Sequence, residues 1–164
     1  MSVTPHLCLS VVIPCFNEER TVGEVVATVL ASPWVGEVIV VDDGSTDASR
    51  EVLATIEHPM LRVVHQPANR GKGAALRTGF AHATLPFVVV QDADLEYDPS
   101  EFGVLLEPLL ADRADVVFGS RFVSSRPHRV LYFWHSLGNK LLTLASNVFT
   151  DLNLTDMETC YKVF

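Results

Sequence analysis

The chain has 164 residues, enough for one domain with a buried core. Apolar residues make up 48% of it and charged residues 20%, which is ordinary for a soluble globular protein. The formal net charge of −8 argues against a general nucleic-acid-binding protein, because such proteins neutralise phosphates with Lys and Arg.

Strand-like and helix-like segments alternate along most of the chain. The predicted strands are 7–14, 37–47 (which ends in a polar turn), 61–65, 86–92 and 115–121. The predicted helices are 18–31, 73–83 and 100–112. Another helix, which ends near Ile56, is predicted to be capped by Ser45, Thr46 or Asp47. Continuous β-branched runs separated by helices indicate an α/β fold: a Rossmann-like, mainly parallel sheet with helices on both faces. We expect one domain over residues 1–164.

A further helix is predicted between Arg129 and Phe149. Its apolar residues repeat at intervals of four and three positions: Val130, Trp134, Leu137, Leu141, Leu144 and Val148. Two placements fit this pattern. The helix can pack on the sheet, or it can lie at a membrane surface, where its aromatic residues and the preceding Arg126 and Arg129 favour the interface.

Polar residues follow four of the predicted strands. The segments are "PCFNEE", "DDGSTD", "QDADLE" and "GSR". Because ligands of open parallel sheets bind beyond the carboxyl ends of the strands, we expect these segments to converge on one site.

The acidic run after the fourth strand predicts a metal site. Asp92 and Asp94 leave the strand two positions apart, and such carboxylates suit Mg²⁺ or Mn²⁺, which bind oxygen and keep places for phosphate. Glu96 can assist, whereas Asp98 before Pro99 is expected to be a turn or cap residue. The spacing excludes an EF-hand, and "NRGKGAAL" lacks the spacing of a P-loop.

The motifs "SVVIPCFNEE", "VIVVDDGSTD", "NRGKGAALRTGF", "QDADLEYDP", "VVFGSR" and "LTDMETCYKVF" together resemble the GT-A glycosyltransferases of family 2. The likeness is greatest to dolichyl- or polyprenyl-phosphate hexosyltransferases that use GDP-mannose or UDP-glucose. The resemblance implies inverting, metal-dependent transfer of a hexose to a lipid phosphate. An acceptor hydroxyl on a glycan or protein, or a non-catalytic nucleotide-sugar-binding domain, are the alternatives.

The resemblance also implies a set of site residues. Donor binding is carried over to Pro14, Phe16, Glu18, Val41, Asp43, Lys72, Gly73, Asp92, Ala93, Asp94, Glu96 and Arg121. Metal binding falls to Asp92, Asp94 and Glu96, and the catalytic set is Asp156, Asp94 and Arg121. Asp156 would orient the acceptor or act as base, with Glu158 as the competing carboxylate and a helix or turn cap as the alternative role of Asp156.

The cellular setting follows from the cysteines and the absence of targeting signals. Cys8, Cys15 and Cys160 show neither metal-ligand nor disulfide spacing, so we expect reduced core thiols and a cytoplasmic protein, peripheral at the cytoplasmic membrane face. Neither a signal peptide nor a membrane-spanning run is expected. Relatives usually continue beyond the last motif, so we expect a catalytic core that ends early at Phe164.

Overall fold

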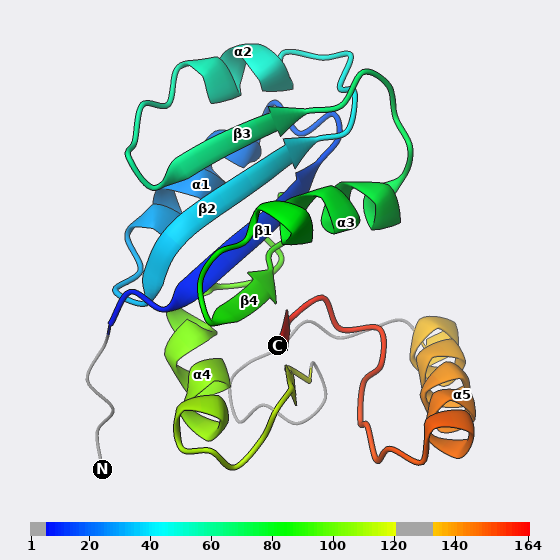
Figure 1. Cartoon of the computed structure of the whole chain (residues 1–164). Coiled ribbons are helices and arrows are strands. Elements are labelled where there is room, and N and C mark those ends of the chain that lie inside the picture. Colours follow the sequence, from blue (N-terminus) through cyan, green and yellow to red (C-terminus); the bar gives the residue numbers. More distant parts are fainter. Residues whose placement is uncertain (1–5, 121–132) are drawn as a thin grey trace.

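The computed structural model describes residues 6–120 and 133–164. Its centre is a 6-stranded sheet in the order β3-β2-β1-β4-β6-β5 (Figure 1). The strands are β1 (Leu9–Cys15), β2 (Val35–Asp42), β3 (Leu61–His65), β4 (Phe87–Val90), β5 (Val117–Phe118) and β6 (Lys162–Val163). The helices are α1 (Val22–Leu30), α2 (Ser49–Ala54), α3 (Lys72–His82), a 3₁₀ turn η1 (Pro99–Glu101), α4 (Phe102–Leu110) and α5 (Phe133–Thr150).

The strand pairing confirms a mainly parallel sheet. β1 pairs in parallel with β2 and β4, and β2 pairs in parallel with β3. The other edge is antiparallel, because β6 runs against both β4 and β5. The strand predicted at 115–121 is shorter than expected: within the described residues, only Val117–Phe118 (β5) are in a strand. Its partner, β6, comes from the C-terminal end of the chain.

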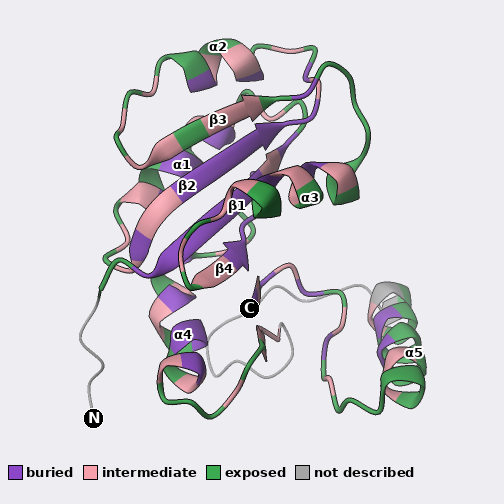
Figure 2. Cartoon of the chain, viewed as in Figure 1, coloured by how far each residue is buried: buried purple, intermediate pink, exposed green. Residues whose placement is uncertain are grey.

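Strand residues alternate between two apolar layers, one on each face of the sheet. Val11 and Ile13 of β1 pack in the larger cluster with α1, α2 and α4, whereas Val12 packs with Ala75 of α3. Figure 2 shows the central strands as almost wholly buried, with helices on both faces. Burial on both faces explains why these strands read as continuous apolar runs.

The strand order reverses at β1: β2 and β3 are added on one side of it, and β4, β6 and β5 lie on the other. Ligands of such sheets bind in the crevice beyond the carboxyl ends of the strands, at the place where the strand order reverses. The polar segments "PCFNEE" and "QDADLE" both begin at this crevice.

Helix α5 lies apart from the sheet and is joined to β6 by residues 151–161 (Figure 1). The described members of the predicted apolar stripe, Trp134, Leu137, Leu141, Leu144 and Val148, are exposed. The prediction that this stripe packs on the sheet is therefore wrong for these residues. Val130, Arg126 and Arg129 lie outside the described residues.

Polar residues form the inner face of α5. Asn139 and Thr143 are buried, and Asn147 both donates to the Leu154 carbonyl and accepts from the Leu154 N–H, each at 2.9 Å. The Met157 N–H donates to Thr143 Oγ1 at 3.2 Å. The irregular segment after α5 must satisfy its backbone polar groups, and this polar stripe supplies the partners. Across the described residues, no helix combines the length and apolarity needed to cross a bilayer.

Candidate active site

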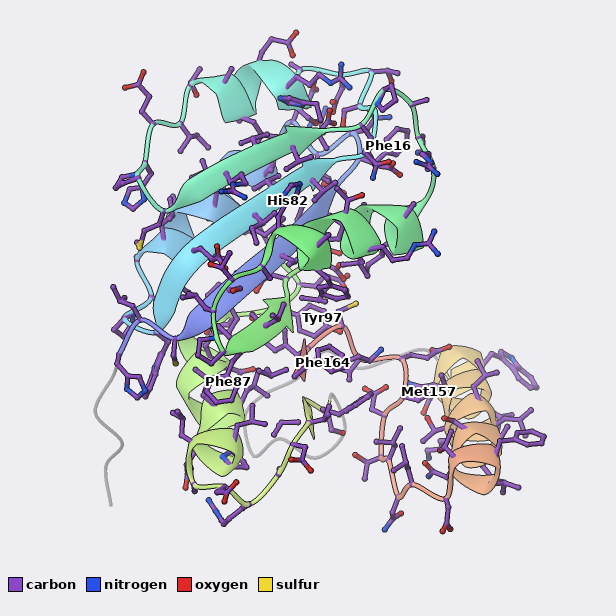
Figure 3. The ribbon with its side chains drawn as sticks, viewed as in Figure 1. Phe16, His82, Phe87, Tyr97, Met157 and Phe164 are labelled. Carbon is purple, nitrogen blue, oxygen red and sulfur yellow. The ribbon has the colours of Figure 1, made fainter. Side chains whose placement is uncertain are left out.

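A pocket of about 300 Å³ opens at the carboxyl ends of β1, β2 and β4, beside the N-terminal end of α3. Its walls are Pro14, Cys15, Phe16, Glu18, Asp43, Asn69, Gly71, Lys72, Ala75, Asp92, Ala93 and Asp94. Figure 3 shows Phe16 at the edge where the parallel strands end. The polar segments that follow β1, β2 and β4 thus converge as predicted, whereas Gly119 and Ser120 of the fourth predicted segment, "GSR", are not part of the wall.

Most of the predicted donor-binding residues line this pocket. They are Pro14, Phe16, Glu18, Asp43, Lys72, Asp92, Ala93 and Asp94. Gly73 and Glu96 are not part of its wall, and Val41 lies in the apolar layer with Val12 and Ala75. Arg121 lies outside the described residues.

Four wall residues were not predicted as site residues: Cys15, Asn69, Gly71 and Ala75. Asn69 and Gly71 belong to the glycine-rich "NRGKG" segment, so this motif could have indicated that they lie at the site.

The segments after β1 and β2 hold each other in place. The Asn17 N–H donates to Ser45 Oγ at 3.0 Å, and the Thr46 N–H donates to Asn17 Oδ1 at 2.8 Å. The Glu18 N–H donates to Ser49 Oγ at 2.8 Å. Of the three predicted cap residues, Asp47 provides the capping bond, because its Oδ1 accepts the N–H of Ser49, the first residue of α2, at 3.0 Å, although the N-cap position itself is Ala48. Ser45 and Thr46 instead brace the segment that presents Phe16 and Glu18.

Asp43 fixes the entry to α3. Its buried carboxylate accepts the Arg70 N–H at 3.0 Å and the Gly71 N–H at 2.8 Å. The neighbouring Gly44 has φ of +75°, and an added Cβ would lie 2.6 Å from the Ala68 backbone. Only glycine suits so close an approach in this conformation. Asp43 therefore positions one wall of the pocket while its side chain also lines it.

Asp42 is fully buried next to the pocket and braces β2 against β3 and α2. Arg50 Nε lies 2.5 Å from its carboxylate and His65 Nδ1 lies 3.1 Å from it. Burial alone would raise the pKa of Asp42, but hydrogen bonds from Ser45, His65 and Arg50 lower it to about 2.

A lysine stands against the predicted metal ligands. Lys72 Nζ lies 2.5 Å from Asp92 Oδ1 and 3.5 Å from Cys160 Sγ. Burial disfavours the ammonium ion, but the hydrogen bond and charge of Asp92 outweigh this effect and raise the pKa of Lys72. Burial, followed by the neighbouring carboxylate, raises the pKa of Cys160, which is partly buried at the site instead of lying in the core as predicted.

The acidic run does not converge as three ligands. Asp92 and Asp94 line the pocket, whereas Glu96 contributes its N–H to Asp94 Oδ1 at 3.1 Å. No group of three or more His, Cys, Asp or Glu side chains in the described parts of the chain could hold a metal ion. The two pocket carboxylates fit a cation that takes its other ligands from a bound diphosphate, and the Lys72 ammonium already marks a cationic position beside Asp92. Asp98 accepts the Ser100 N–H at 2.9 Å and caps η1, which confirms its predicted role.

Gln91, which was not among the predicted site residues, anchors both ends of the acidic loop. Its fully buried side chain donates to the Asp92 carbonyl at 3.1 Å and to the Tyr97 carbonyl at 3.4 Å. It accepts the Tyr161 hydroxyl at 2.8 Å, and the Cys160 N–H donates to the Tyr97 hydroxyl at 3.2 Å. Figure 3 shows Tyr97 beside the C-terminal strand. The acidic loop is therefore tied to the last motif of the chain.

Asp156 is buried but does not line the pocket. Its carboxylate accepts from Asn139 Nδ2 of α5 at 2.9 Å, and Asn139 Oδ1 in turn accepts from the Thr143 hydroxyl at 3.0 Å. Glu158, the competing carboxylate, is exposed. The polar stripe of α5 thus holds the segment that carries Asp156.

Comparison with known proteins identifies the family of this chain. Residues 10–164 match the family described as Glycosyl transferase family 2. A dolichyl-phosphate beta-glucosyltransferase of Trichomonas vaginalis is 28% identical over 172 residues, covering 95% of this chain and 52% of that protein. A dodecaprenyl-phosphate galacturonate synthase of Rhizobium johnstonii is 36% identical over 126 residues, covering 69% of this chain and 36% of that protein.

The fold has solved counterparts. Glucosyl-3-phosphoglycerate synthase from Mycobacterium tuberculosis, crystallised with Mn²⁺, uridine diphosphate and phosphoglyceric acid, has a TM-score of 0.71 and 25% identity to this chain. The match covers 96% of this chain and 55% of that chain. The chain thus spans about half the length of this counterpart and of the Trichomonas relative. With the family match over 10–164 and a GT-A counterpart for its sheet, the chain belongs to glycosyl transferase family 2.

Proposed function

We propose that this chain is the catalytic core of an inverting, metal-dependent hexosyltransferase that uses a nucleotide sugar as donor and a polyprenyl or dolichyl phosphate as acceptor. The observation that carries the proposal is the pocket whose wall contains Phe16, Glu18 and Asp43 together with Asp92 and Asp94. Its wall joins an exposed aromatic ring, hydrogen-bonding carboxylates and two carboxylates suited to a cation, which matches the base, ribose and diphosphate of a nucleotide sugar.

The residues divide by the part of the donor that each suits. Phe16 offers an exposed ring face for the base, and Asp43, anchored by backbone N–H groups, offers carboxylate oxygen to base or ribose. Asp92 and Asp94 would hold Mg²⁺ or Mn²⁺, which neutralises charge on the leaving diphosphate when bound. Arg121 is proposed to approach the phosphates, and Val41, Gly73 and Glu96 to support the donor site from beside it.

The lipid-phosphate acceptor is supported by what similar proteins are named for. Relatives carry dolichyl-phosphate, dodecaprenyl-phosphate and undecaprenyl-phosphate in their names. A phosphate oxygen is already anionic near neutral pH, so positioning by Asp156 matters more than removal of a proton by it. Helix α5 also hydrogen-bonds to Asp156 through Asn139. Its exposed apolar stripe suits a membrane surface from which such an acceptor is taken.

Calorimetric titration tests the donor site. Wild-type protein, Asp94→Ala and the control Asp115→Ala, which removes an exposed carboxylate outside the pocket, are titrated with UDP-glucose and GDP-mannose, with and without Mn²⁺. We expect one donor to bind in the presence of Mn²⁺, Asp94→Ala to lose that binding, and the control to retain it. Binding that ignores both Mn²⁺ and Asp94 would overturn the metal-dependent donor site.

Transfer and membrane binding are measured separately. A radiolabelled hexose should pass from the donor that binds to a polyprenyl phosphate in vesicles, and an Asp156→Asn variant should bind the donor but transfer more slowly. Donor binding without transfer to the lipid would favour a hydroxyl acceptor or a non-catalytic nucleotide-sugar-binding domain. Vesicle co-sedimentation that is unchanged in Leu141→Ser and Leu144→Ser would contradict the role given to α5.

A further inference from the structure

We infer that Lys72 is an internal cation that competes with the divalent metal for Asp92, so that loading the site exchanges one cation for the other. The inference rests on the proposed function, because it concerns the same metal. Lys72 would thus weaken metal binding, whereas a metal ligand would strengthen it.

Lys72 occupies a position that helix electrostatics disfavours. It is the first residue of α3, where the N–H groups of the first turn repel a positive charge. The preceding Gly71 has no side chain to cap the helix, and the first turn from Lys72 to Ala75 contains no acidic residue. Any protein partner of the ammonium ion therefore comes from outside the first turn of the helix.

Asp92 is that partner. Its carboxylate comes from the loop after β4 and is 13% exposed, whereas the Lys72 side chain is 50% exposed. The ion pair draws the ammonium into the pocket wall and offsets the repulsion between Asp92 and Asp94, which line the same pocket. Before a metal arrives, Lys72 thus supplies the counter-charge that two neighbouring carboxylates require.

The two cations repel each other when both lie on this carboxylate. Mg²⁺ binds oxygen ligands at roughly 2.0–2.1 Å. Lys72 Nζ lies 2.5 Å from Asp92 Oδ1, so both cations on that oxygen would lie within about 5 Å of each other. A single pair of unit charges 4 Å apart already changes an equilibrium constant about fivefold in bulk water, and a divalent ion doubles the energy. The half-exposed lysine stem is long enough for the ammonium to turn away into solvent.

Removing the charge of Lys72 should therefore strengthen metal binding. Mn²⁺ is titrated without nucleotide into wild-type protein, Lys72→Met and Lys72→Arg, and free Mn²⁺ is followed by electron paramagnetic resonance. We expect Lys72→Met, which keeps an apolar stem, to bind Mn²⁺ about fivefold or more tightly than wild type. Lys72→Arg, which keeps the charge, should remain within about twofold of wild type.

The matched control is Arg77→Met, which removes an exposed positive charge from the same helix but outside the pocket. Its Mn²⁺ affinity should stay within about twofold of wild type, which separates exchange at Asp92 from a general change in net charge. Equal or weaker Mn²⁺ binding by Lys72→Met, in protein with wild-type circular dichroism, would overturn the inference. A gain of the same size in Arg77→Met would overturn it as well.

The proposed function fails in a different way. If wild-type protein and Lys72→Met both bind no Mn²⁺ without nucleotide, the exchange is refuted, and the metal site itself is refuted only if the donor titration is also independent of Mn²⁺. If Asp94→Ala binds Mn²⁺ as well as wild type, the metal site is refuted and the exchange with it. If Mn²⁺ binds and depends on Asp94 but not on Lys72, the metal site stands and the exchange alone is refuted.

Discussion

The contact between α3 and the sheet permits a sharp test of how the pocket wall is held. Gly79 is buried against β1, and a Cβ built on it would lie 2.2 Å from Val12 Cγ1. Val12 is fully buried and β-branched, so its side chain has little freedom to turn away and the helix must move. We expect Gly79→Ala to cost about 3 kcal/mol of overpacking, offset by about 1 kcal/mol of helix propensity, a net loss of about 2 kcal/mol.

Gly73 provides the matched control on the same helix. A Cβ at Gly73 meets nothing within 4 Å, so Gly73→Ala should keep wild-type stability or gain up to about 1 kcal/mol. Urea denaturation followed by circular dichroism gives both free energies of unfolding, and the two variants should differ by about 2–3 kcal/mol. Equal stability of the two variants would refute the close packing of α3 on β1.

Three further predictions concern buried polar groups. Because the pKa of Asp42 is lowered from 3.8 to about 2, its stabilising effect is complete above pH 3.8 and is lost toward pH 2. Between pH 5 and pH 2, urea denaturation should show wild type losing about 2 kcal/mol more than Asp42→Asn. Gln91→Leu should cost about 3 kcal/mol in the same assay, because it leaves the buried Tyr161 hydroxyl without its acceptor. Asp43→Asn should raise hydrogen exchange at the Arg70 and Gly71 amides without changing exchange in β1, as measured by NMR.

Much of the sheet and of the pocket edge could be predicted from the sequence because their signals are local. The apolar run at Leu9–Cys15 and the helical spacing of Val22, Val25, Val26 and Val29 each reflect burial that the structure confirms. Parallel strands then bring their carboxyl ends to one edge, so that Phe16, Asp43 and Asp92 meet without any knowledge of side-chain contacts. The expectation followed from the topology alone.

The contacts that organise the site join residues far apart in the chain, and no local pattern encodes them. The Gln91–Tyr161 hydrogen bond spans 70 positions, and the Lys72–Cys160 contact spans 88. β6 has only two residues, too few for a periodic signal, yet it pairs with β4 and β5 and brings Tyr161 and Cys160 to the acidic loop. These contacts depend on tertiary packing, which a single sequence does not disclose.

Helix α5 shows what periodicity leaves undecided. Hydrophobic spacing establishes that a helix has an apolar face. It does not identify what covers that face, because this depends on the contacts that the other residues of the helix make. Here Asn139, Thr143 and Asn147 lie at intervals of four and bind the 154–157 segment, whose backbone groups would otherwise lose their hydrogen bonds. Satisfying these groups turns the apolar stripe outward. The same bonds hold Asp156, so a surface that covers the stripe would act on a helix that contacts this carboxylate directly.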